Sequence, residues 1–243
     1  MSQVVDTESA KEFMKEALAK VSPDELNQIC GQLERKSQLF RSWLGPEVLQ
    51  NSQAPEMYKI LRNIFSTRRK AQKLLETFSQ ASLSSWMREL LYGEQEIGQR
   101  FQAFCDHLDG VETPVRYDLA SEVLHFTFPG RFWLWTRWMW DPKTRTGALP
   151  LVTTEEYELS STTLGQTYVK VGEAVAFVHH VGEAAGFQTI SRSLFGTDVY
   201  LGCVYVIYAY TVLRMRMTQE FNKVVPGLSE FVRRLLGVYR LEE

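Results

Sequence analysis

The stretch SPDELNQICGQLERKSQLFRSWLGP, residues 22–46, carries the clearest secondary-structure signal in the chain. Ser22 is a favoured N-cap, Pro23 suits the first helical position, and Glu25 completes a capping box with Ser22. Apolar residues then recur at helical spacing until a Gly-Pro pair ends the pattern. They are Leu26, Ile29, Leu33, Phe40, Trp43 and Leu44. The stretch therefore predicts one long amphipathic helix.

Similar signals on both sides of this stretch predict a mainly helical chain. Leu164, Tyr168, Val171, Val175 and Val178 step by four and three residues, which is typical of a helix. We expect a first helix that starts at Asp6 or Thr7 and a later helix that starts at about Asp198. Further helices are expected over about 55–78, 83–92, 97–108, 119–125 (capped by Asp118) and 228–236. Thr153-Thr154-Glu155-Glu156 predicts one further helix start.

The segment FTFPGRFWLWTRWMW, residues 126–140, interrupts this pattern. Its dense aromatic residues fit either one or two short strands or an ordered loop. We therefore predict a mainly α, multi-helix globular fold with a small irregular or β element around residues 115–140. We expect an N-terminal helical region (1–110), followed by a region (111–243) that holds the aromatic segment and a C-terminal pair of long helices. The two regions could also form one continuous domain.

Composition and charge exclude several classes of protein. The 243 residues are 44% hydrophobic and carry a net charge of −2, so the whole chain is not drawn to nucleic acid or to an anionic membrane. The three cysteines are far apart and predict neither disulfides nor a zinc site. The polar N-terminus does not resemble a secretory signal. The uncharged run 199–213 is too short for a membrane span and predicts a buried helix, so we expect a cytoplasmic protein with no membrane span.

Motifs for the common catalytic classes do not occur in the sequence. There is no GxSxG nucleophile motif, no GxxxxGK[ST] phosphate loop and no GxGxxG dinucleotide motif. The sequence therefore favours a non-catalytic protein that needs no cofactor.

A metal site is the alternative that the histidines suggest. Glu122 and His125 form an ExxH pair, the spacing that di-iron helical bundles use. Glu173, His180 and Glu183 follow at helical spacing and could supply further ligands. These five residues define the alternative hypothesis, a helical metalloenzyme. A di-iron site wants a second ExxH pair, however, and here the second pair runs in reverse as HxxE.

The aromatic segment and its surroundings are also rich in arginine and lysine. Arginine combined with flat aromatic surface is typical of protein-binding hot spots and of sites for single-stranded nucleic acid. The predicted contact residues here are Arg131, Trp133, Trp135, Arg137, Trp138, Lys143 and Arg145. The tryptophans could equally fill the core between the two halves of the chain, since aromatic side chains bury large areas.

Two further basic clusters lie elsewhere in the sequence. In the first, Arg62, Arg69 and Lys73 align on one face of the helix predicted over 55–78. The second consists of Arg214, Arg216, Lys223, Arg233 and Arg234. If these clusters and the aromatic segment converge in space, the nucleic-acid hypothesis gains support.

From these observations we predict a helical binding or assembly protein that works inside a larger complex. Its contact surface combines the Arg/Trp segment with Arg62, Arg69 and Lys73. The predicted partner is another protein subunit, with nucleic acid as the second candidate.

Overall fold

The computed structural model describes residues 4–51, 53–184, 193–216 and 227–242. Within these ranges the chain forms eleven α-helices and one short 3-10 helix, and it contains no β-sheet. The elements are α1 (Thr7–Lys20), α2 (Pro23–Trp43), α3 (Pro46–Asn51), α4 (Ala54–Arg62), α5 (Ala71–Thr77), α6 (Gln80–Tyr92), α7 (Ile97–His107), α8 (Thr113–Thr127), η1 (Leu149–Leu151), α9 (Leu164–Ala184), α10 (Gly196–Arg216) and α11 (Leu228–Leu235). The predicted mainly α class is confirmed, and the element after α8 is irregular.

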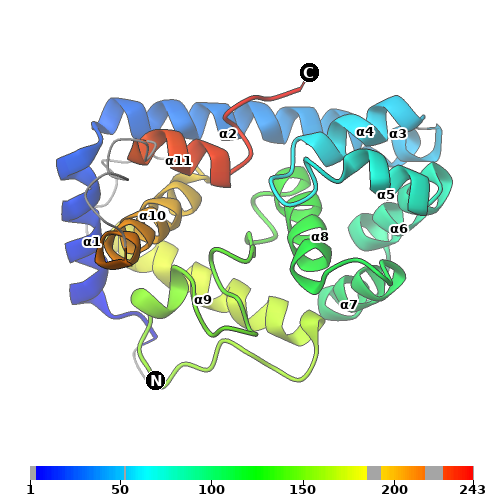
Figure 1. The fold of residues 1–243 in the computed structure, drawn as a ribbon. Helices are drawn as coiled ribbons and strands as arrows, with labels where there is room; N and C mark the ends of the chain where they lie inside the picture. Colours follow the sequence, from blue (N-terminus) through cyan, green and yellow to red (C-terminus); the bar gives the residue numbers. More distant parts are fainter. Residues whose placement is uncertain (1–3, 52, 185–192, 217–226, 243) are drawn as a thin grey trace.

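Helix α2 runs along one side of the fold in Figure 1, from the helix α1 at its start to the helices around α4 at its end. The Ser22 hydroxyl accepts from the backbone N–H of Glu25 at 3.2 Å, so the predicted N-cap is present. The apolar face of α2 packs against α8, α10 and α11. The helices α3 to α7 lie near its C-terminal end, and α1 lies near its start (Figure 1).

One hydrophobic core extends through most of the described chain. It begins at Val5, ends at Val238 and includes residues from almost every helix. Contacts between α2 and α8, between α7 and α9, and between α1 and α10 link the regions 1–110 and 111–243.

Helices α7 and α9 approach closely because glycines face each other where they meet. A Cβ atom built on Gly165 of α9 would lie 1.9 Å from the carbonyl oxygen of Gly98 on α7. The Gly165 N–H donates to the side chain of Gln102 at 3.1 Å. The contact between α7 and α9 is the most extensive helix pair in the described structure, so these glycines fix a central packing distance.

Helix α10 contains the uncharged run 199–213 and is buried along most of its described length. The hydroxyl of Tyr200 donates to the carbonyl oxygen of Ala10 at 2.9 Å, which gives this buried tyrosine a polar partner. Among the described residues no helix has both the length and the apolar character that crossing a membrane requires. The prediction of a buried core helix here is confirmed.

The helix predicted over 55–78 is wrong as a single element. The chain forms α4 and α5 instead, separated by turns over residues 63–70. Asn63 ends α4, and its side-chain amide donates both to Lys59 O and to Glu242 O. Such side-chain bonds compete with the helical ladder, and no glycine or proline in the sequence marks this break.

The helix predicted to start at Thr153 is also wrong, because α9 begins at Leu164. Thr153 pairs with Val5 in an isolated antiparallel bridge, and its hydroxyl donates to Leu149 O at 3.0 Å. The first turn of α9 is stabilised instead by the hydroxyl of Thr163, which accepts from the N–H of Gln166 at 3.2 Å.

The helix predicted over 119–125 is longer at both ends and forms α8. Pro114 lies in its first turn, where proline is well tolerated. Asp118 does not cap it, since this residue lies within the helix and binds another segment.

Gly165→Ala should lower the free energy of unfolding by about 1–3 kcal/mol, because the added methyl group meets backbone atoms of α7 that cannot rotate away. Gly31→Ala is a matched control, since Gly31 is an exposed position in α2 with nothing within 4 Å of a built Cβ. There the substitution should stabilise the protein by about 0.5–1 kcal/mol. Urea unfolding of the two variants measures both changes, and equal stability would contradict the proposed α7–α9 contact.

Candidate functional site

Helix α8 carries a line of buried polar side chains on one face. Their spacing of three and four residues aligns Asp118, Ser121, Glu122 and His125. The Asp118 carboxylate accepts from the backbone N–H of Arg137 at 2.8 Å. The Ser121 hydroxyl accepts from the backbone N–H of Trp135 at 2.6 Å. The polar face of α8 therefore satisfies backbone groups of the irregular aromatic segment, which has no helix or sheet to do so.

His125 links this segment to helix α10. Its Nδ1 lies 2.8 Å from the carbonyl oxygen of Phe132, and its Nε2 lies 2.9 Å from Oδ2 of Asp198. A carbonyl oxygen and a carboxylate oxygen both accept hydrogen bonds, so this site favours the imidazolium form, in which both ring nitrogens donate. Burial lowers the pKa of His125, but Asp198 and the Phe132 carbonyl raise it by more, and the net shift is upward.

Lys36 of α2 is completely buried beside Glu122. Its ammonium lies 2.6 Å from Oε2 of Glu122 and donates to the carbonyl oxygen of Leu236 at 2.9 Å. The Phe126 ring lies 4.0 Å from the same nitrogen, within the range of a cation–π contact. Burial lowers the pKa of Lys36 and raises the pKa of Glu122, and each partner opposes the shift of the other. This pair ties α2, α8 and the end of α11 together.

The C-terminal segment reaches Lys36 because residue 237 is glycine. Gly237 has φ +72°, and a Cβ atom built there would lie 2.6 Å from Asn63 O and 2.8 Å from Lys36 Nζ. The N–H of Val238 donates back to Arg233 O at 2.9 Å, which closes the end of α11.

Asp118 is a second buried acid of this network whose pKa is raised. Burial raises the pKa of its carboxyl to about 8, while the hydrogen bond from the Arg137 N–H opposes the rise. The negative charge of Glu122 adds to the increase, and the hydroxyl of Ser66, in the turn between α4 and α5, lies beside the carboxyl.

Of the five residues of the metalloenzyme hypothesis, the four with described side chains do not converge. Glu122 pairs with Lys36, and His125 uses both ring nitrogens for protein partners. Glu173 is exposed on α9 and accepts from the Tyr157 hydroxyl at 3.2 Å, and His180 is exposed farther along that helix. The side chain of Glu183 lies outside the described residues. Within the part of the chain that is described, no three His, Cys, Asp or Glu side chains form a metal-binding group.

Most of the tryptophans in the aromatic segment fill the core. Trp135 is fully buried, stacks on Tyr117 with ring centroids 4.2 Å apart, and donates to Trp140 O at 2.9 Å. Trp138 is 6% exposed, and Trp133 is half-buried. Trp135 and Trp138, which the sequence assigned to a contact surface, thus lie in the core, because the segment packs against α8 with these rings inward.

The cationic side chains of the same segment do reach the surface. Arg131 is exposed, and its guanidinium lies over the rings of Phe128 and Phe132 at 5.7 and 5.3 Å. The other exposed cations are Arg137, Lys143 and Arg145. Arg145 pairs with Glu158 at 3.3 Å. The arginines and the lysine of this region thus lie at the surface, whereas most of the tryptophans lie in the core.

Arg62, Arg69 and Lys73 do not form the predicted stripe on one helix. Arg62 ends α4, Arg69 lies in the following turn, and Lys73 is exposed on α5. The break between α4 and α5 instead brings Arg62 against the C-terminal segment.

The C-terminal segment and the α4–α5 turn form a second basic surface, which we call the C-terminal arginine surface. Hydrogen bonds and ring contacts link Arg62, Arg68, Arg234, Tyr239 and Arg240. We include in this surface the exposed Phe65 and Arg69 of the same turn. The guanidinium of Arg68 donates to Arg240 O at 2.7 Å, and that of Arg62 donates to Arg68 O at 3.0 Å. Figure 1 shows the red C-terminal segment running beside the cyan chain around α4.

The charges on this surface are partly balanced. Arg62 pairs with Glu242 at 2.7 Å, and Arg234 pairs with Glu230 at 2.6 Å. Five arginines against two glutamates leave a net charge of +3. Burial, and then the positive charge of Arg62, lowers the pKa of Arg68, which shows that the arginines lie close enough to repel.

Part of the second basic cluster in the sequence joins this surface. Arg234 lies 4.3 Å from the Tyr239 ring centroid, and Arg233 donates to the side chain of Gln32 at 3.0 Å. Lys223 and the side chains of Arg214 and Arg216 lie outside the described residues.

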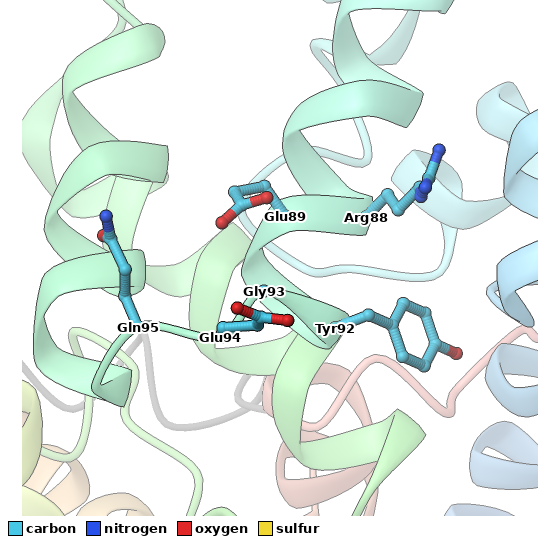
Figure 2. A pocket seen from close by; sticks show the side chains of 6 residues that line it. All are labelled: Arg88, Glu89, Tyr92, Gly93, Glu94 and Gln95. Atoms are coloured by element: carbon cyan, nitrogen blue, oxygen red, sulfur yellow. The ribbon is translucent and has the colours of Figure 1, made fainter.

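A separate pocket of about 430 Å³ lies at the end of α6 (Figure 2). It is lined by Arg88, Glu89, Tyr92, Gly93, Glu94 and Gln95. Its two carboxylates outnumber its single guanidinium, so it does not extend the basic surfaces.

No protein-family model matches the sequence, and no curated protein or solved structure gives a significant match. The site is therefore interpreted from its own geometry.

Sequence reasoning missed three important members of these sites. Lys36 falls on the apolar stripe of α2 between Leu33 and Phe40, and a lysine at such a position signals a buried charge. Asp198 is likewise in register with the buried Leu201. No local pattern in the sequence marks Tyr239, because its place on the surface depends on how the C-terminal segment folds back.

Lys36→Met should destabilise the protein by about 3–5 kcal/mol, because Glu122 would remain buried without its cation. Adding Glu122→Met to that variant should recover much of the loss, since the unpaired charge is then removed. Chemical denaturation of the single and double variants measures the coupling. If the double variant loses as much stability as the two single variants together, or more, the proposed coupling between Lys36 and Glu122 is contradicted.

Asp118→Asn should flatten the dependence of thermal stability on pH. The folded pKa of about 8 exceeds the ordinary value of 3.8, so the native carboxyl holds its proton while the unfolded one releases it. Stability of the unmodified protein should therefore fall as pH rises between about 4 and 8. His125, whose pKa is also raised, contributes in the same direction as pH rises above its ordinary value of 6.5. Melting temperatures between pH 5 and pH 8 test the difference, and parallel curves for the two proteins would refute this role of Asp118.

Proposed function

We propose that this chain is a non-catalytic binding protein of a larger assembly, and that it holds an anionic macromolecule on the C-terminal arginine surface. The convergence of the α4–α5 turn with the C-terminal segment carries the proposal. It brings Arg62 and Arg68 to Arg240 although about 170 residues separate them in sequence.

The repulsion among the arginines of this surface supports a binding role. Like charges held together reduce the stability of a compact state unless a partner neutralises them. The chain as a whole has a net charge of −2, yet this surface carries +3. Arginine and tyrosine are also the residues that most often dominate binding energy at contact surfaces.

The buried network supports binding rather than catalysis. Lys36, Glu122 and His125 each have a protein partner at 2.6–2.9 Å, and all three are at most 2% exposed. Groups fixed in this way stabilise the fold, and a substrate would have to displace their partners to reach them.

The cysteines suit an intracellular setting for this function. Cys30, Cys105 and Cys203 are all buried, and none of them forms a disulfide bond within the described chain. Reduced thiols persist in a reducing compartment, which supports a cytoplasmic location as part of this proposal.

Arg69→Glu combined with Arg240→Glu should abolish binding of polyanions, because the surface charge changes from +3 to −1. The probes are a labelled poly-glutamate peptide and a labelled oligothymidylate, and fluorescence anisotropy at low salt measures their affinity. We expect at least one probe to bind the unmodified protein and to lose affinity in the variant.

Lys143→Glu with Arg145→Glu is the matched control. It makes the same change of charge on the exposed turn that follows the aromatic segment. A greater loss of binding in this control would move the contact surface to that turn, and binding of neither probe by the unmodified protein would reject the proposal.

A further inference from the structure

We infer that the C-terminal arginine surface binds single-stranded nucleic acid, with its arginines on the phosphates and Phe65 stacked against a base. This inference rests on the proposed function and names the class of partner. Phe65 is an exposed aromatic side chain that does not belong to the hydrophobic core.

Arg62 and Arg68 are held in place by hydrogen bonds but keep donors for a ligand. Arg68 donates from one terminal nitrogen to Arg240 O at 2.7 Å. A guanidinium has five N–H donors in a planar fork, so most of its donors stay available for phosphate oxygens. Arg69 is exposed next to it and forms no salt bridge with any described residue. Preformed guanidinium groups lose less conformational freedom when a phosphate binds.

Phe65 supplies the flat apolar surface that a base requires. It lies between Arg62 and Arg68 in the α4–α5 turn and is 50% exposed, more than any other aromatic side chain described. Within the described chain it makes no ring–ring contact. Tyr239, also partly exposed, adds a second ring at the same surface, with Arg234 packed 4.3 Å from its centroid.

The balance of charge and aromatic surface favours a nucleic acid over a protein partner. The centres of protein–protein interfaces are depleted of charged residues. This surface instead combines five arginines with two exposed rings, and two of the arginines lie against the Tyr239 ring. A cationic track with interleaved aromatic rings is the arrangement that binds single strands, because every base offers a face for stacking. A duplex keeps its bases stacked internally and offers Phe65 no such face.

Phe65→Ala should weaken binding of a labelled oligothymidylate between about 5-fold and 150-fold, the loss expected for one stacked base. Phe65→Trp should retain or improve the affinity. Phe177→Ala is the matched control, because Phe177 is 45% exposed on α9, away from the arginine surface, and should leave affinity unchanged. Melting temperatures of all three variants verify that each is folded.

Salt dependence tests the phosphate contacts separately. The logarithm of affinity should fall linearly with the logarithm of salt concentration, and Arg69→Gln should make the slope shallower by about 0.7 for one lost phosphate contact. An unchanged slope would remove Arg69 from the phosphate contacts.

The poly-glutamate and duplex probes decide between partner classes. Tighter binding of oligothymidylate than of both other probes, with dependence on Phe65, supports the inference. If poly-glutamate binds as tightly and Phe65→Ala has no effect, the partner is an acidic protein segment and the inference falls while the proposed function stands. Equal binding of duplex DNA without any effect of Phe65 also overturns it. If no probe binds, both proposals fail.

Discussion

The ammonium of Lys36 is the constraint around which the rest of the structure is arranged. A cation removed from water must be compensated by charge and hydrogen bonds, and two distant parts of the chain, α8 and the end of α11, provide the groups around Lys36. Glu122 supplies the charge from α8, Leu236 supplies a carbonyl oxygen, and Phe126 places its ring against the nitrogen. Each contact fixes one segment relative to α2, so the C-terminal segment is held by the same group that positions the central helix.

Helix α8 extends this principle to the aromatic segment. A buried irregular segment must find partners for its backbone N–H and C=O groups. The side chains of Asp118, Ser121 and His125 provide three of them, at 2.6–2.8 Å from the segment. With its backbone bound in this way, the segment turns most of its tryptophans inward and its arginines outward. The ExxH pattern of α8 is thus part of a structural scaffold.

The same contacts explain why the basic surface lies where it does. Lys36 and Asn63 hold the chain around residue 237, and the residues that follow continue over the end of α4. Arg240 consequently meets Arg68, and Tyr239 meets Arg234. The proposed binding surface is thus a product of the buried network, although none of the buried groups belongs to that surface. Loss of the network would therefore disturb the surface as well as the fold.

Local signals in the sequence determined the helical class and several helix boundaries. Ser22 and Pro23 start α2, and the apolar stripe from Leu164 to Val178 predicts α9, because capping and periodicity act within a few residues. The break at Asn63, the inward orientation of Trp135 and the irregular course around Thr153 have no such local cause. They depend on hydrogen bonds to residues far away in sequence, as does the meeting of Arg68 with Arg240. The sequence by itself therefore determined which segments are helical, and only the tertiary structure decided which charges are buried, which rings form the core and which arginines share a surface, because those choices depend on contacts that local spacing does not encode.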